Sequence, residues 1–182
     1  MDAARPGHYG QVTPSVLEEL ETIVGASNLI AGDPEAMQDY AHDEVAGERY
    51  AHMPEVVVKP GSSAQVSQIL KLANRERVPV TPRGAGSGLS CGAVPIYGGI
   101  LLSLERMNRI LEIDEENLVI VVQPGVVTND INDAVEPCGL FYAGYPMSLE
   151  LCFIGGNVAE NAGGGRAIKY GVTGRYVLGL EV

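Results

Sequence analysis

Two glycine-rich segments are the residues of this sequence best suited to bind a ligand. The first runs from Arg83 to Gly92 (RGAGSGLSCG) and the second from Ile154 to Gly165 (IGGNVAENAGGG). Glycine lacks a Cβ, so its main chain adopts positive φ and approaches a ligand closely. Consecutive main-chain N–H groups in such turns bind phosphate. Because each segment follows a short apolar run, we expect the two to bind one extended ligand, a dinucleotide, from two sides.

Neither common nucleotide-binding motif fits the first segment. A P-loop ends in Gly-Lys-Ser/Thr, but no lysine stands between Lys71 and Lys169. A Rossmann turn needs a third glycine where Leu89 stands, and a helix directly after it. The chain leads instead to the strand-like Ile100–Leu104, so phosphate would contact loop N–H groups rather than a helix N-terminus. These differences argue against the alternative of a domain for NAD or a sugar nucleotide.

Charge narrows the class of ligand. The formal net charge is −11, which argues against binding to nucleic acid or to an anionic membrane. Residues 56–103, which include the first glycine segment, carry five basic side chains and one acidic one. An anionic ligand would therefore be attracted to this part of the chain. A place on a helix surface would account for Lys71, Arg75 and Arg77, but less readily for Arg83, which stands beside the glycines.

Cysteine and histidine give no metal or catalytic pattern. The three cysteines lack C-x-x-C spacing, which argues against both a disulfide framework and a zinc site; they are Cys91, Cys138 and Cys152. The three histidines are scattered among polar residues at positions 8, 42 and 52. We therefore assign no metal ligand and no catalytic residue.

Membrane and export signals are also absent from the sequence. No apolar run approaches the ~20 residues that a membrane span needs. Residues 1–7 (MDAARPG) lack the hydrophobic segment of a signal peptide. We therefore expect a cytoplasmic protein.

The first half of the chain predicts a βαβ unit. Thr13 and Pro14 mark a helix start, and apolar residues at helical spacing follow as far as Gly25. The acidic stretch 26–55 predicts little regular structure beyond a short helix at 34–41, with Asp43 and Glu44 solvated or capping turns. Three further elements are then expected: a strand at Glu55–Val58, a helix after a capping box at Ser62–Gln65, and a strand at Val78–Thr81. The last strand delivers the first glycine segment to the sheet edge where open α/β sheets bind ligands.

The second half predicts a meander of short strands. These are Ile100–Leu104, Ile110–Ile113 and Leu118–Val122, with Asp114–Asn117 as a hairpin loop. A helix is expected at Val127–Val135 and a strand-like run at Tyr176–Val182. The glycines of the second segment also fit tight turns between antiparallel strands. The expected fold class is α+β: a small βαβ subdomain followed by a mixed or antiparallel sheet flanked by helices, C-terminally incomplete.

Six segments in order resemble one flavoprotein family. The sequence is similar to the PCMH-type FAD-binding domain of the vanillyl-alcohol oxidase/p-cresol methylhydroxylase flavoproteins, and within them to the branch containing the FAD subunit of glycolate oxidase and the D-lactate dehydrogenases. Any one glycine motif is weak evidence, but six in sequence are specific. The segments are Pro54–Pro60, Val80–Gly92, Gln123–Gly125, Tyr145–Cys152, Ile154–Gly165, and Lys169–Thr173 with Val177–Val182.

The resemblance implies which residues bind FAD. It places the pyrophosphate on the main chain of one loop, with the Ser87 hydroxyl and with Pro82 setting the turn: Pro82, Arg83, Gly84, Ala85, Gly86, Ser87, Gly88 and Leu89. Three residues are expected to border the flavin and its phosphate-ribose arm: Pro146, Ser148 and Leu149. Six are expected to line the isoalloxazine ring and ribityl chain: Gly155, Gly156, Asn157, Ala159, Gly163 and Gly164. Val182 falls where the family contacts adenine through its main chain. Some members attach FAD covalently to a histidine where Ser87 stands, so we expect non-covalent FAD.

The resemblance also implies a function and a domain division. We expect a helical or irregular segment at residues 1–53 and an incomplete FAD domain at 54–182, without the cap domain that binds substrate. The whole protein would oxidise a 2-hydroxy acid of the glycolate or D-lactate type by hydride transfer to flavin. Partner subunits, and through them a peripheral place at the inner membrane, fit this branch. The alternative is a non-catalytic fragment or partner-completed subunit that binds FAD weakly or not at all.

Overall fold

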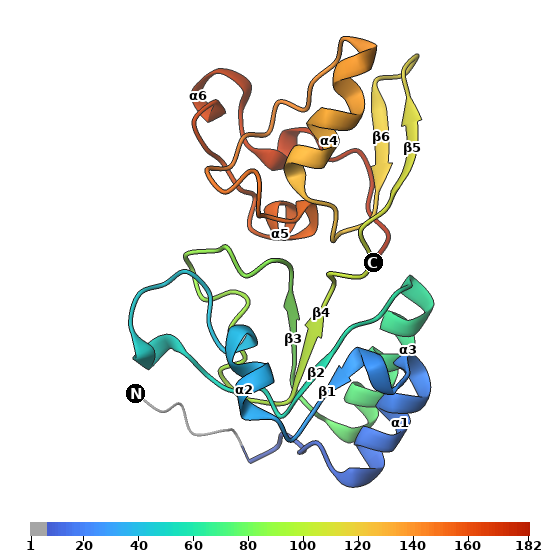
Figure 1. The fold of residues 1–182 in the computed structure, drawn as a ribbon, viewed down its shortest axis with the longest axis vertical. Coiled ribbons are helices and arrows are strands. Elements are labelled where there is room, and N and C mark those ends of the chain that lie inside the picture. The colour runs from blue at the N-terminus through green and yellow to red at the C-terminus, as the bar shows by residue number, and fades with distance from the viewer. Residues whose placement is uncertain (1–6) are drawn as a thin grey trace. The chain divides into compact units, whose positions relative to one another are not determined.

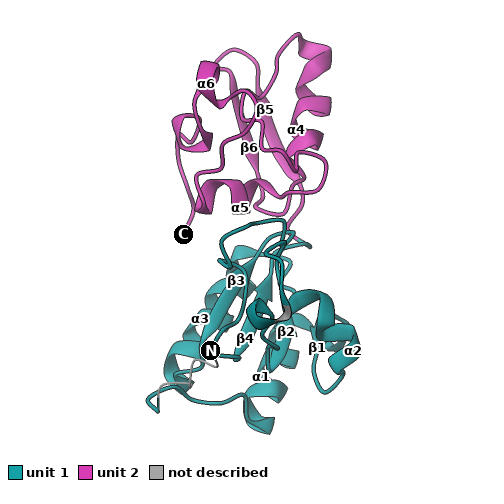
Figure 2. Cartoon of the chain, turned by 90° about the vertical axis from the view of Figure 1, so that its left-hand side faces the viewer, with its two compact units in different colours: residues 1–106 teal, residues 107–182 magenta. Residues whose placement is uncertain are grey.

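The computed structural model describes residues 7–182, apart from the side chain of Glu48. The chain divides into two compact units, Met1–Arg106 and Met107–Val182 (Figure 2). Each unit has its own hydrophobic core. The observed mixture of helices with parallel and antiparallel strands confirms the predicted α+β class.

The first unit is built on a four-stranded sheet in the order β1-β2-β4-β3. Its strands are β1 (Leu29–Ile30), β2 (Val56–Val58), β3 (Val80–Arg83) and β4 (Ile100–Ser103). β4 pairs in parallel with both β2 and β3, whereas β1 is antiparallel to β2. The carboxyl ends of three strands therefore meet at one edge of the sheet, as the prediction for ligand binding requires.

The place of β4 corrects the predicted meander. Ile100–Leu104 was expected beside the later strands, but Leu101 pairs with Val57 on one side and Thr81 on the other. All four residues of β4 are buried. A central parallel strand is covered on both faces and so is apolar at successive positions, whereas a meander strand alternates. The continuous apolar run Ile100–Leu102 is therefore the feature of the sequence that indicates a central parallel strand.

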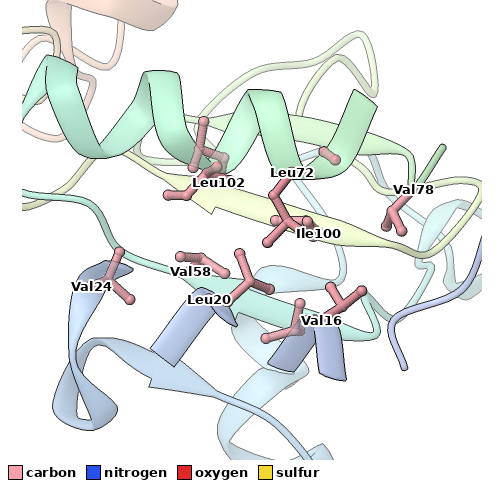
Figure 3. Packing of buried hydrophobic residues seen from close by; sticks show 11 residues of the cluster. Val16, Leu20, Val24, Val58, Leu72, Val78, Ile100 and Leu102 are labelled. Carbon is pink, nitrogen blue, oxygen red and sulfur yellow. The ribbon is translucent and has the colours of Figure 1, made fainter. Parts of the chain in front are cut away.

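Helices cover both faces of this sheet (Figure 1). α1 (Pro14–Val24) and α3 (Ser63–Glu76) pack on one face, where Leu20 and Leu72 meet Ile100 (Figure 3). On the other face Val57 and Leu101 contact Met37 of α2 (Pro34–Met37). Alternate strand residues thus enter two separate clusters, as the two-residue period of a strand dictates.

Local signals set the ends of the main helices as predicted. The Thr13 hydroxyl accepts a hydrogen bond from Val16 N at the start of α1, and Gly25 follows its end with φ 84°. Ser62 caps α3 by accepting from Gln65 N. The Gln65 side chain accepts from Gly61 N and donates to Ile23 O, so it also ties α3 to the end of α1.

Two expectations for the first unit shift in detail. The short helix at 34–41 is α2 followed by the 3₁₀ turn Gln38–Tyr40, and further 3₁₀ turns lie at Ala26–Asn28 and Glu48–Tyr50. The strand expected at Val78–Thr81 is β3 and begins two residues later. Val78 N donates instead to Ala73 O at the end of α3, so this residue closes the helix before the strand starts.

The second unit contains a hairpin and three helices. β5 (Ile110–Asp114) and β6 (Val119–Val122) pair antiparallel, and Asp114 accepts from Asn117 N across the predicted turn. The predicted helix at 127–135 is α4 (Thr128–Val135), which ends in the 3₁₀ turn Glu136–Cys138. Val126, Ile131 and Ile154 form the core, and the short helices α5 (Ile154–Ala159) and α6 (Ala167–Tyr170) complete the unit with the 3₁₀ turn Thr173–Arg175.

In the second unit, one alternative is excluded and one prediction is wrong. The second glycine segment does not form turns between antiparallel strands, because its first half is α5. The run Tyr176–Val182 forms no strand; a strand needs a neighbouring main chain to pair with, and within the described residues none pairs with it. No helix of residues 7–182 has the length and apolar character to cross a membrane.

We predict that Gly99→Ala destabilises the first unit more than Gly32→Ala does. Both glycines have left-handed φ, 72° and 71°, where alanine costs about 1–2 kcal/mol. A Cβ at Gly99 would also collide with the Pro79 carbonyl, which accepts from Ile100 N, whereas a Cβ at Gly32 meets open space. Overpacking adds about 1–3 kcal/mol, so urea unfolding should show the larger loss for Gly99→Ala. Equal losses would contradict this account.

Candidate functional site

The first glycine segment follows the carboxyl end of β3. Arg83 O accepts from Leu104 N, the residue after β4, and this is the last bond of the β3–β4 pairing. The loop then runs to Gly99 without a helix or strand. We call residues 84–92 the glycine loop. Its course confirms that no helix N-terminus stands behind these glycines.

The N–H groups of the glycine loop are the main feature of the site. None of the N–H groups from Gly84 to Leu89 donates to an acceptor within residues 7–182, and the Ser87 hydroxyl likewise has no partner there. Two residues beyond Leu89, Cys91 N donates to the Asp43 carboxylate at 2.7 Å. Residues 84–88 are half-buried and Leu89 is exposed, so these N–H groups are accessible to a ligand. Six successive unpaired donors suit an anion with several oxygen atoms, such as phosphate.

The side chain of Arg83 corrects one expectation. Its guanidinium was the candidate for contact with an anionic ligand, but it is buried and donates to His42 O at 2.6 Å and to Asp39 O at 2.8 Å. Burial lowers the pKa of Arg83, while Tyr40 and nearby carboxylates oppose that shift. A Cβ at Gly86, which has φ 74°, would collide with the guanidinium. The Arg83 side chain therefore packs against the loop at Gly86 and ties the start of the loop to residues 39 and 42.

Asp43 is bonded to the glycine loop, a contact that the sequence did not predict. It was expected to be solvated or to cap a turn, but only 5% of its surface is exposed. One carboxylate oxygen accepts from Val45 N at 3.0 Å, which confirms the turn cap, and the other accepts from Cys91 N. The next residue, Glu44, donates its N–H to Gly88 O at 3.1 Å. No periodicity or motif around residue 43 signals the bonds to Cys91 and Gly88, because these partners lie far away in the sequence.

A polar cluster occupies the carboxyl ends of β2 and β4. Glu105 accepts from Ser103 at 2.8 Å and from the Tyr40 hydroxyl at 3.1 Å, and forms an ion pair with Lys59 at 2.7 Å. Burial alone would raise the pKa of Glu105, but the bonds from Lys59 and Ser103 outweigh it and lower the pKa. The cluster thus holds Tyr40, and the chain that follows it, on the edge of the sheet.

The second unit explains part of the second glycine segment by packing. Gly155 N donates to Pro124 O at 2.8 Å, and a Cβ at Gly155 would lie 2.6 Å from the Pro124 Cβ. A Cβ at Gly164 would collide with Tyr145 O. Gly156 differs, because a Cβ there meets nothing within 4 Å. Packing within the described chain therefore accounts for Gly155 and Gly164 but leaves the glycine at 156 without a reason.

Asn157 carries an unpaired buried acceptor. The residue is 5% exposed, and its amide nitrogen donates to the Thr128 hydroxyl at 2.6 Å and to Cys152 Sγ at 3.4 Å. Thr128 in turn donates to Cys152 O at 3.2 Å, so the amide orientation is fixed. The side-chain amide oxygen of Asn157 (Oδ1) receives no hydrogen bond from residues 7–182, whereas its main-chain oxygen accepts from Ala162 N. A buried amide oxygen without a donor fits a ligand that carries an N–H group.

The other predicted residues lie around these features. Ser148 O accepts from Leu151 N and Cys152 N, both at 2.8 Å, and Leu149 O accepts from Asn129 N of α4. Pro146 is buried in the same stretch. Ala159 ends α5, Gly163 is exposed beyond it, and Val182 is fully exposed. The structure thus gathers residues 82–89 in the first unit and most of residues 146–164 in the second. That both groups bind one ligand stays a prediction.

Among the described residues, no cluster of three or more His, Cys, Asp or Glu side chains has an arrangement that suits a metal ion. The three cysteines are free thiols. The chemistry that the chain presents is therefore that of main-chain N–H donors, an amide and close-packed glycines.

These features agree with the match to known proteins. Residues 54–182 match the family model described as FAD binding domain, and the chain belongs to this family. The resemblance inferred from the glycine segments is thereby confirmed, as is FAD as the cofactor of the family.

Two relatives and one solved structure illustrate the match. The chain is 45% identical over 171 residues to the glycolate oxidase subunit of Bacillus subtilis (strain 168), covering 94% of this chain and 36% of that protein. It is 44% identical over 174 residues to a D-lactate dehydrogenase of Anaerostipes hadrus, covering 96% and 36%. An alkyldihydroxyacetonephosphate synthase shares the fold with a TM-score of 0.83 at 20% identity, covering 98% of this chain and 34% of that one. The chain spans about a third of the length of these relatives.

We predict that Thr128→Val costs about 1–3 kcal/mol of unfolding free energy, because it leaves the buried Asn157 amide with only a sulfur acceptor. Valine has nearly the shape of threonine, so the loss reports the hydroxyl. The control is Thr22→Val on the exposed surface of α1, where the hydroxyl donates to Glu18 O; this change should stay within about 0.5 kcal/mol. Similar urea midpoints for the two variants would show that the buried network contributes nothing.

Proposed function

We propose that this chain is the FAD-binding part of an oxidoreductase that oxidises a 2-hydroxy acid. The observation that carries the FAD assignment is the run of unpaired N–H groups from Gly84 to Leu89 in a chain of the FAD-binding family. The substrate class is supported by the names of the two relatives, which refer to glycolate and D-lactate, both 2-hydroxy acids.

The proposal assigns separate groups of residues to the pyrophosphate and to the flavin ring of FAD. The N–H groups of residues 84–89 and the Ser87 hydroxyl would bind the pyrophosphate, with Pro82 and Arg83 shaping the start of the loop. Asn157 would accept from the N–H of the flavin pyrimidine ring, and the open face of Gly156 would leave room for the flat ring. The other proposed contacts are Pro146, Ser148, Leu149, Gly155, Ala159, Gly163, Gly164 and Val182.

The chain's own contribution is binding and electrostatics. When bound, flavin would supply the acceptor for the hydride that leaves the α-carbon of the 2-hydroxy acid, and release of the hydroxyl proton would complete the change to a 2-oxo acid. The donors proposed around the cofactor favour its pyrophosphate charge. We assign no catalytic base or acid to residues 7–182, and we propose that FAD is held without a covalent bond because Ser87 stands in the loop where some family members carry a histidine.

Domain limits, partners and location are further parts of the proposal. We propose an FAD domain over 54–182, preceded by the N-terminal helical or irregular segment 1–53, whose α1, β1 and α2 pack into the first unit. The word subunit in one relative's name supports an assembly with partner subunits in the whole protein. A cytoplasmic location stays a prediction from the sequence.

Thermal unfolding with FAD and with NAD tests the cofactor. A ligand at about a hundred times its Kd stabilises the folded state by about 2.7 kcal/mol, so FAD should raise the Tm and NAD should not. Acid precipitation of the complex should release the flavin into solution. A shift with NAD alone, or flavin retained in the precipitate, would contradict the proposed cofactor or its non-covalent binding.

Anaerobic titration of the full-length protein tests the reaction. Glycolate or D-lactate should bleach the oxidised flavin, whereas the same acids without a 2-hydroxyl group should not. FAD binding without bleaching by any 2-hydroxy acid would favour the alternative of a non-catalytic or partner-completed subunit. Native mass measurement with candidate partners would then separate these two.

We predict that Gly156→Ala stabilises the free chain and weakens FAD binding. Alanine is favoured over glycine inside a helix by up to about 1 kcal/mol, and no atom of the described chain obstructs a Cβ there. A methyl group in the space proposed for flavin should raise the Kd for FAD about tenfold, or about 1.4 kcal/mol. Gly7→Ala, at an equally open glycine outside both segments, is the control. Unchanged FAD affinity in Gly156→Ala would remove this glycine from the site.

A further inference from the structure

Residues 39–44 hold the glycine loop at both of its ends, and we call them the clamp segment. At the start of the loop, Arg83 donates to the main-chain oxygens of Asp39 and His42. Toward its end, Gly88 O accepts from Glu44 N, and Cys91 N donates to Asp43. Between Arg83 and Cys91 lie residues 84–89, whose N–H groups have no partner in the described chain.

Asp43 is the central side chain of the clamp segment. Its carboxylate is buried, and burying a charge is costly unless hydrogen bonds compensate it. The two bonds that it accepts run to its own turn at Val45 and across to Cys91. Cys91 has φ 60°, a left-handed conformation that is strained for a residue other than glycine. The bond from Cys91 to Asp43 therefore fixes the loop at a point where the main chain would otherwise relax.

The clamp segment is itself anchored to the sheet. The Tyr40 hydroxyl donates to Glu105, which is paired with Lys59 and bonded to Ser103 at the ends of β2 and β4. The Arg83 guanidinium also lies over the Tyr40 ring, 5.8 Å from its centre. The clamp therefore connects the glycine loop to the rigid carboxyl edge of the sheet.

We propose that Asp43 is a positioning residue for the FAD pyrophosphate, which rests on the proposed function that this chain binds FAD. A glycine-rich loop without tethers would have to be ordered when the ligand binds, and that entropy would be subtracted from affinity. The clamp orders the loop beforehand and keeps its N–H groups without intramolecular partners. Asp43 lies outside residues 54–182, the part of the chain that the family model matches. The functional cofactor site thus begins ahead of the matched domain.

Binding of three probes to the 182-residue chain tests this role. FAD contains both pyrophosphate and flavin, ADP contains the pyrophosphate without flavin, and riboflavin contains flavin without phosphate. Loss of a hydrogen bond to a charged group lowers affinity by about ten- to a hundredfold, so Asp43→Ala should weaken FAD and ADP by that factor and leave riboflavin unchanged. Asp43→Asn keeps one oxygen acceptor and should lie between Asp43→Ala and the unaltered chain.

The matched control is Asp114→Ala. Asp114 also accepts two hydrogen bonds, from the main chain and side chain of Asn117 at 2.9 and 2.8 Å, but in the hairpin of the second unit. This variant should leave the affinity for FAD and for ADP unchanged. Unfolding without ligand is measured in parallel, and if Asp43→Ala does not fold, Asp43→Asn decides. Amide hydrogen exchange should be faster at Cys91 in Asp43→Ala, because its N–H loses its acceptor.

The outcomes separate the two proposals. If the unaltered chain does not bind FAD, the proposed function fails and the role of Asp43 fails with it. If the unaltered chain binds FAD and the folded Asp43 variants bind FAD and ADP equally well, only the role of Asp43 is overturned. Equal weakening of riboflavin and ADP would also overturn it, because a general structural defect affects both probes.

Discussion

The candidate site depends on keeping main-chain donors unpaired. A polypeptide normally satisfies its N–H groups in helices, sheets and turns, and six successive exceptions need a structural cause. Here the cause is the pairing of β3 with β4 at one end and the bonds from Asp43 and Glu44 at the other. The glycines allow the conformation, but tertiary contacts from a distant segment keep it. The binding capacity of the loop is thus a property of the whole first unit.

Glycine is required for different structural reasons in the two segments. In the first, glycine is needed for left-handed φ and for contact with a buried guanidinium, as at Gly86. In the second, Gly155 allows α5 to lie directly on the chain at Pro124, and Gly164, beyond α5, allows the main chain to pass close to Tyr145. The open Gly156 and the unpaired oxygen of Asn157 are the exceptions within this close packing. They are therefore the positions of the second unit where a ligand explains more than the fold does.

Local patterns predicted most of the elements. Caps at Thr13 and Ser62 and the spacing of apolar residues located α1 and α3, because their determinants lie within a few residues of each other. The hairpin around Asp114 followed from its turn residues in the same way. The family and its cofactor followed from the order of six glycine and proline motifs, which is also local information.

The failures concern partners that are distant in sequence. The pairing of β4 between β2 and β3, the burial of Asp43 and the structural role of Arg83 all depend on contacts across more than ten residues. The run Tyr176–Val182 has apolar residues at strand spacing but no neighbouring strand among the described residues. Propensity predicts the type of an element, whereas its neighbours decide whether a strand forms and which side chains become buried.

The bonds of Arg83 have a consequence for how this fold tolerates change. Both of its acceptors are carbonyl oxygens, at positions 39 and 42, and every amino acid supplies such an atom. Substitution at those two positions can therefore alter side-chain chemistry while leaving the attachment intact. The guanidinium has no such freedom, since lysine is a point charge without the rigid planar fork that reaches two acceptors at once. Positions 39 and 42 can therefore vary in evolution, whereas position 83 must remain arginine for this contact to persist.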